Sequence, residues 1–164
     1  GGLRDVTATA SGTSAATAVL ANDPTMPIVD VDASATASAS SSFVQAIDTQ
    51  NSAQIDGGSF TATDTATLGQ AAALFAEGAT VMGGATLTAT GGSAAYPAYV
   101  VGSSAVVRIQ NSTLKGAGGL FVASGDTLDI AGSQVPGAIA SVSGTANCPD
   151  DWLADYATAN ADCS

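Results

Sequence analysis

The chain has 164 residues and a formal net charge of −11, and Arg4, Arg108 and Lys115 are its only cationic side chains. Nucleic-acid binding needs clustered Lys and Arg to neutralise phosphates, so this charge balance effectively excludes it and also disfavours an anionic membrane surface. Apolar residues make up 46% of the chain, but only 5% are aromatic and many of the others are alanine. An ordinary globule of this composition would bury little apolar area, so a regular, repetitive architecture is expected.

Features of the chain ends point to an exported protein. No signal peptide is visible, and no apolar run approaches the roughly 18 residues that span a bilayer, so no membrane insertion is expected. The opening "GGLRDV" lacks Met, which predicts a processed product or a piece of a longer protein. Cys148 and Cys163 lie close together in the sequence. We interpret them as a disulfide of an extracellular, cell-surface or periplasmic protein, with a pair of free thiols as the alternative.

Six segments of the chain repeat one pattern at intervals of roughly 20 to 27 residues. Each begins with a large aliphatic residue, bends two residues later, and continues as a strand that alternates small apolar residues with Thr or Ser. The aliphatic positions are Leu3, Ile28, Ile55, Met82, Ile109 and Ile130. The bend positions are Asp5, Asp30, Gly57, Gly84, Asn111 and Gly132, all residues that tolerate a left-handed backbone or hydrogen-bond to it.

This repeat predicts the fold class. A rung made of an aliphatic residue, a bend and an alternating strand is typical of a parallel β-helix, in which each rung stacks on the next at about 4.8 Å. The sequence therefore predicts an all-β protein, a right-handed parallel β-helix of about six rungs over residues 1–147. The Thr positions are expected to be the outward side of a stacked strand.

The second half of each rung does not alternate cleanly. Its runs, such as "TAVLA" and "AALFA", are apolar on both sides, as in strands buried on both faces. A lone coil would leave Leu20, Phe75, Val100 and Phe121 as a wet apolar stripe. Self-association along this stripe, as a homotrimer, is the expected outcome, and a loop folded over it is the alternative.

Residues 148–164, "CPDDWLADYATANADCS", change in character. Trp152, Leu153 and Tyr156 have helical spacing after an acidic first turn, which predicts a short helix or tight loop closed by Cys148–Cys163. This disulfide-closed cap would cover the last rung and prevent edge-to-edge pairing.

The segments "LRDVTATASG", "SAVVRIQNSTLKG" and "CPDDWLADYATANADC" resemble a known family. They are similar to the Thr/Ala-rich β-helical repeats that form tip domains of exported bacterial or phage-like trimeric fibre and adhesin proteins. The resemblance covers nearly the whole chain, and the Cys pair around Trp152 and Tyr156 is its more specific part. It implies a trimeric right-handed β-helix at a fibre tip, used for adhesion or receptor recognition.

Catalysis and metal binding have weak candidates. Asp5, Asp30 and Asp32 could supply the clustered carboxylates of a polysaccharide-degrading, tailspike-like enzyme, but turn chemistry already explains the first two. Histidine is absent, which rules out His-based triads and disfavours zinc sites. Asp30, Asp32 and Asp56 could bind calcium, but no calcium-loop motif occurs and solvated surface acids explain them better. We therefore predict no enzyme activity, no cofactor and no metal.

Two binding functions remain. The regular Thr rows would make a flat array of methyl and hydroxyl groups suited to ice binding, but Asp32 and Lys115 interrupt them, and Thr ladders also form for packing reasons alone. A recognition module for a cell-surface glycan or receptor fits better, because polar loops lie on a rigid scaffold. Tyr96 and Tyr99 are the expected ligand contacts, with burial in a subunit seam as the alternative.

Overall fold

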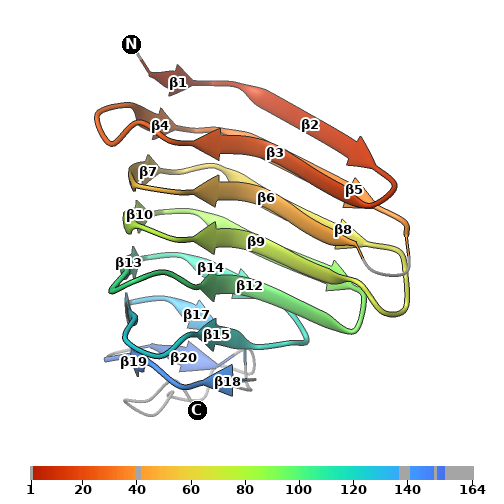
Figure 1. Cartoon of the computed structure of the whole chain (residues 1–164). Coiled ribbons are helices and arrows are strands. Elements are labelled where there is room, and N and C mark those ends of the chain that lie inside the picture. Colours follow the sequence, from red (N-terminus) through yellow and green to blue (C-terminus); the bar gives the residue numbers. More distant parts are fainter. Residues whose placement is uncertain (1, 40–41, 137–140, 150, 154–164) are drawn as a thin grey trace.

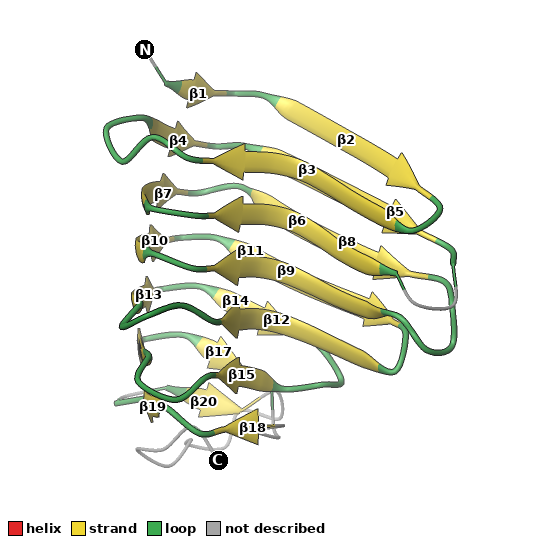
Figure 2. Ribbon diagram, in the orientation of Figure 1, coloured by secondary structure: helices red, strands yellow, loops and turns green. Residues whose placement is uncertain are grey.

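The computed structural model describes residues 2–39, 42–136, 141–149 and 151–153. All regular structure in these residues is β-strand, and no helix in them is long and apolar enough to cross a membrane (Figure 2). The strands form three parallel sheets, and successive strands of the chain belong to successive sheets. The chain therefore winds as a β-solenoid whose coils lie in tiers from the N-terminal end downward (Figure 1).

Each sheet takes every third strand. Sheet A contains β1 (Leu3–Arg4), β4 (Pro27–Val29), β7 (Ser52–Asp56), β10 (Ala79–Gly83), β13 (Val106–Gln110), β16 (Thr127–Ala131) and β19 (Thr145–Asn147). Sheet B contains β2 (Thr7–Gly12), β5 (Asp32–Ala37), β8 (Ser59–Asp64), β11 (Thr86–Gly91), β14 (Thr113–Lys115), β17 (Gln134–Val135) and β20 (Trp152–Leu153). Sheet C contains β3 (Ala15–Ala21), β6 (Phe43–Thr49), β9 (Gln70–Ala76), β12 (Ala94–Val100), β15 (Leu120–Val122) and β18 (Ser141–Val142).

The register confirms the predicted aliphatic column. In sheet A each member pairs directly with the next, from Leu3 opposite Ile28 to Ile109 opposite Ile130. Leu3, on the first strand, is half-buried, and the other five members are buried inside the coil. Like residues stack on like because every coil repeats the same inward positions.

The bend column is also confirmed. Its six members all have positive φ, from 48° at Asn111 to 73° at Gly57. Asp and Asn tolerate this left-handed conformation better than other side chains, and glycine adopts it freely. The corner between sheets A and B is therefore a backbone requirement that the sequence satisfies in each of these six coils.

Several predictions about the length, winding and C-terminal part of the solenoid need correction or stay open. The count of about six rungs is not confirmed, because sheets A and B each have seven strands. Trp152 and Leu153 form β20, which pairs in parallel with β17, so the solenoid continues past the predicted boundary at residue 147 and these two residues are not helical. Backbone pairing with the preceding coil wins over the local helical spacing.

Cys148 is buried, whereas Cys163 and Tyr156 lie outside the described residues, so the disulfide-closed cap stays a prediction, as does the right-handed sense of winding.

Gly84 provides a test of the bend requirement. Its φ is 65°, and a Cβ added there would meet nothing closer than the Gly57 nitrogen at 3.9 Å, so space is not limiting. Replacement of Gly84 by Val should lower the free energy of unfolding by about 1–2 kcal/mol, because a β-branched side chain resists the left-handed region. Gly84→Asn should cost clearly less. Urea denaturation measures both, and equal losses would show that the conformation is not what limits this position.

Candidate functional site

The outer face of sheet C gathers five of the chain's aromatic residues, and its geometry follows from an interruption of the pairing at the same place in each long strand. The pairing skips one residue in each of the four longest strands of this sheet, namely Ala18, Ala46, Ala73 and Pro97. In a regular strand every second residue points outward. Here two inward residues lie between the second and third outward positions, as between Thr17 and Leu20. This break explains the imperfect alternation of these runs in the sequence.

The outward positions form three columns along the solenoid. The first holds Ala15, Phe43, Gln70 and Ala94; the second holds Thr17, Gln45, Ala72 and Tyr96; the third holds Leu20, Asp48, Phe75, Tyr99 and Phe121. Val100, predicted on the sequence to share the exposed stripe, instead points into the coil and is fully buried. Tyr99 takes its place on the outer face.

The third column contains a ladder of stacked rings. The centroids of Phe75 and Tyr99 lie 5.5 Å apart with ring planes at 18°, and those of Tyr99 and Phe121 lie 4.2 Å apart at 6°. Stacked aromatic pairs contribute about 0.5–1.5 kcal/mol each beyond their buried area. The ladder therefore stabilises the sheet from outside.

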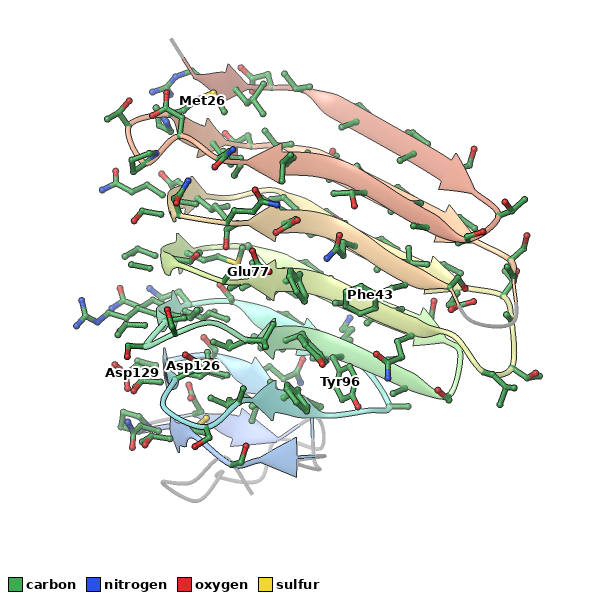
Figure 3. The ribbon with its side chains drawn as sticks, viewed as in Figure 1. Met26, Phe43, Glu77, Tyr96, Asp126 and Asp129 are labelled. Carbon is green, nitrogen blue, oxygen red and sulfur yellow. The ribbon has the colours of Figure 1, made fainter. Side chains whose placement is uncertain are left out.

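Phe43 and Tyr96 flank this ladder and are turned across it. Phe43 meets Phe75 at 78°, and Tyr96 meets Tyr99 and Phe121 at 63° each. Both rings lie on the front face of sheet C in Figure 3. Ala72, which points outward between them, is fully buried, so the rings form a small second core outside the coil.

Tyr96 and Tyr99, the two residues predicted to contact ligand, are therefore brought together on this face, with ring centroids 5.2 Å apart. Both are half-buried, and neither hydroxyl has a hydrogen-bond partner among the described residues. Partial burial, together with the neighbouring Tyr96 hydroxyl, raises the pKa of Tyr99. The Tyr99 hydroxyl thus stays protonated and can donate or accept a hydrogen bond.

Asp48 is the acidic residue of this face that the sequence interpretation missed. It lies between Leu20 and Phe75 in the third column and is only 7% exposed. Its Oδ2 accepts a long hydrogen bond of 3.5 Å from the amide of Gln50, and its Oδ1 has no partner among the residues that the structure describes. Burial, and then the charge of Glu77, raise the pKa of Asp48. An acid inside the apolar run "FVQAIDT" was the available signal.

Polar groups border the aromatic cluster. Gln45 accepts a hydrogen bond from Thr17 at 2.7 Å, while the side-chain amide of Gln70 makes no hydrogen bond among the described residues. Glu77 is exposed just beyond the end of β9 (Figure 3). The face therefore combines ring surfaces with amide, hydroxyl and carboxylate groups.

The other predicted acids do not assemble into a site. Asp5 and Asp30 occupy the positive-φ bends, as turn chemistry suggested. The described residues contain no group of three or more metal-binding side chains. Two further acids, buried and not anticipated, brace loops: Asp126 accepts backbone N–H groups of Gly102 and Ala105 at 2.8 Å each, and Asp64 accepts from Ser42 at 2.7 Å.

A shallow cavity of about 240 Å³ lies on the outer side of sheet A, lined mainly by Arg108, Gln110, Asp129, Asn147 and Pro149. Three of its polar side chains already interact with one another. Arg108 lies 3.8 Å from Asp129, which also accepts a 2.8 Å hydrogen bond from Asn147. This cavity is therefore a weaker candidate than sheet C.

The outer face of sheet B carries the predicted Thr rows. Its columns are in direct register, and on β2, β5, β8 and β11 every outward position except Asp32 is Ser or Thr. Within the described part of this array, the one hydrogen bond between hydroxyls joins Thr63 and Thr90 at 3.1 Å. The remaining hydroxyls face solvent as a regular grid.

No family model, curated protein or solved structure matches the chain. The resemblance to fibre-tip repeats therefore stays a prediction.

Replacement of Asp48 by Ala should raise the free energy of unfolding at pH 7 by about 1 kcal/mol, because it removes a buried carboxylate oxygen without a partner. The raised pKa makes the folded chain bind the Asp48 proton more tightly than the unfolded chain. Wild-type stability should therefore fall relative to the variant as the pH rises above 3.8, and level off above the folded-state pKa. Urea denaturation at several pH values measures this.

Exposed Asp32→Ala is the control and should change stability by less than about 0.5 kcal/mol. A D48A protein less stable than wild type at pH 7 would contradict the assignment.

Proposed function

We propose that the chain is a non-enzymatic recognition module of an exported fibre or surface protein, and that it contacts its ligand through the outer face of sheet C. The observation that carries this proposal is the cluster of Phe43, Tyr96 and the three-ring ladder, with two tyrosine hydroxyls that have no partner within the described part of the chain. Aromatic residues and tyrosine in particular are enriched where proteins bind partners, because a rigid ring gives contact area at little entropic cost.

The solenoid supplies the rigidity that such a site needs. Each outward ring of the cluster stands on a strand that is hydrogen-bonded to neighbouring strands, and its inward neighbours, such as Leu74 and Ala98, are fully buried. Sites built on strands hold their side chains more closely than sites on loops. An adhesin or receptor-binding role outside the cell, at a cell surface or fibre tip, is the setting we propose.

The homotrimer expected on the sequence receives less support from the exposed stripe than anticipated. Leu20 is 53% exposed, but Phe75 and Phe121 are partly covered by ring contacts, and Val100 is inside the coil. Less apolar area is thus left to bury between subunits. The trimer stays part of the proposal, and sedimentation equilibrium distinguishes 15.7 kDa from three times that mass.

Replacement of Tyr96 by Ala should abolish ligand recognition while the fold is retained, because it removes a ring at the centre of the face. Labelled protein would be applied to a panel of cell types and to a glycan array, with circular dichroism to verify folding. Thr88→Ala, on the outer face of sheet B, is the matched control and should bind like wild type. Unchanged binding by the Tyr96 variant would assign this face a structural role only.

Ice binding is a second candidate function, and the register of sheet B favours it. The hydroxyl grid repeats at about 4.8 Å between coils, as ordered water on a surface would require. Under this function the purified chain shows thermal hysteresis, and Thr61→Lys, at the centre of the grid, removes it. Gln110→Lys on sheet A adds the same charge elsewhere and should leave it unchanged. Absence of hysteresis in concentrated wild-type protein rules this function out.

A further inference from the structure

We infer that the ligand of the sheet C face is a neutral saccharide chain, which lies against the rings of Phe43 and Tyr96 and hydrogen-bonds to the carboxylate of Asp48. This inference rests on the proposed function and names the chemical class of its ligand. It also assigns Asp48 a ligand-contacting role beside its destabilising effect on the folded chain.

Ring orientation leaves two aromatic faces available. Both faces of Tyr99 are covered by Phe75 and Phe121, so Tyr99 meets Phe43 and Tyr96 with its edge. Phe43 and Tyr96 therefore each present one side to the ladder, and among the described residues no ring contact covers their other side. They stand on β6 and β12, two coils or about 9.6 Å apart, and in neighbouring outward columns, so they mark out an extended surface that suits a chain of sugar units. The apolar C–H side of a pyranose packs on such faces.

Asp48 supplies a strong acceptor at the head of the ladder. Its Oδ1 has no hydrogen-bond partner in the described ranges, although a buried polar group without one is rare and costs stability. The side chains next to it can move aside, since Leu20 is 53% exposed and both Gln50 and Glu77 are exposed. A sugar hydroxyl that displaces this cover would satisfy the carboxylate, and hydrogen bonds to charged groups are the stronger ones.

The charge of the face selects a neutral ligand. The chain's three cations are placed elsewhere, Arg4 and Arg108 on sheet A and Lys115 on sheet B. Asp48 and Glu77 would repel an anionic sugar or a phosphate. Gln45, Gln70 and the two tyrosine hydroxyls instead offer uncharged hydrogen-bonding groups.

A second copy of the chain is a poorer occupant. The ring cluster extends from β6 to β15, about 14 Å along the solenoid. A stable protein interface buries about 800 Å² on each partner, well beyond a patch of this length. A patch this small, mixed apolar and polar in its groups, matches a short saccharide better.

Affinity electrophoresis tests the inference directly, because a chain of net charge −11 migrates well in native gels. The gels would contain mixed-linkage β-glucan, xylan, galactomannan, soluble starch or dextran. Wild type should be retarded by at least one of these, and isothermal titration with a hexasaccharide of that polymer gives the affinity. Tyr96→Ala and Asp48→Ala should each weaken binding about tenfold or more. Leu20→Ala should bind at least as tightly as wild type, and Thr88→Ala should be unchanged.

The outcomes separate this inference from the proposed function. Lack of retardation by every polymer, or wild-type affinity in both Tyr96→Ala and Asp48→Ala, overturns the saccharide assignment. Tyr96-dependent binding to cells without any retardation would leave the recognition function in place and reject its saccharide ligand. A trimer that dissociates in Tyr96→Ala would make the face a subunit contact and also reject the inference. Because Asp48→Ala should be at least as stable as wild type, its loss of binding cannot be attributed to unfolding.

Discussion

The structure depends on parallel strands of one chain stacking in register, coil upon coil. Backbone hydrogen bonds run between coils, so every strand needs a neighbour with the same path, and the same inward position recurs in each coil. Ile28, Ile55 and Met82 can therefore stack on one another although no single coil has enough large side chains for a core. Alanine fills the narrow remainder of the interior. The small-residue composition is a consequence of this architecture.

The corners impose the second constraint. A coil can return onto the previous one only if the chain turns at the same place each time, and six left-handed residues between sheets A and B provide this turn. Asp5, Asp30 and Asn111 share the conformation with the glycines because their short polar side chains tolerate it. Asp5 and Asp30, which were candidates for catalysis or metal binding, thus serve the backbone geometry of these turns.

The outside of the solenoid has three chemically different faces. Sheet B presents hydroxyl groups, and sheet C carries the aromatic rings. Sheet A carries two cations, Arg4 and Arg108, and a small cavity lined by polar side chains. Because the coil is closed by its own inward residues, the outward residues are free of the core and can specialise. On sheet C they form a second apolar cluster that buries Ala72, and the buried carboxylate of Asp48 lies beside Phe75 in the same column.

Much of the fold could be predicted from the sequence, because the aliphatic, bend and Thr columns are periodic in the chain itself and stacking preserves that periodicity. The sequence by itself determined the parallel coil, its inward file from Leu3 to Ile130 and the aromatic character of one face. It did not determine which residues of the sheet C strands face outward, because the unpaired residue in each long strand breaks the alternation. It also did not determine that Trp152 and Leu153 pair as a strand. Only the tertiary structure placed Val100 inside, Tyr99 outside and Asp48 beside the rings, because these positions depend on pairing between residues more than 20 apart in the chain.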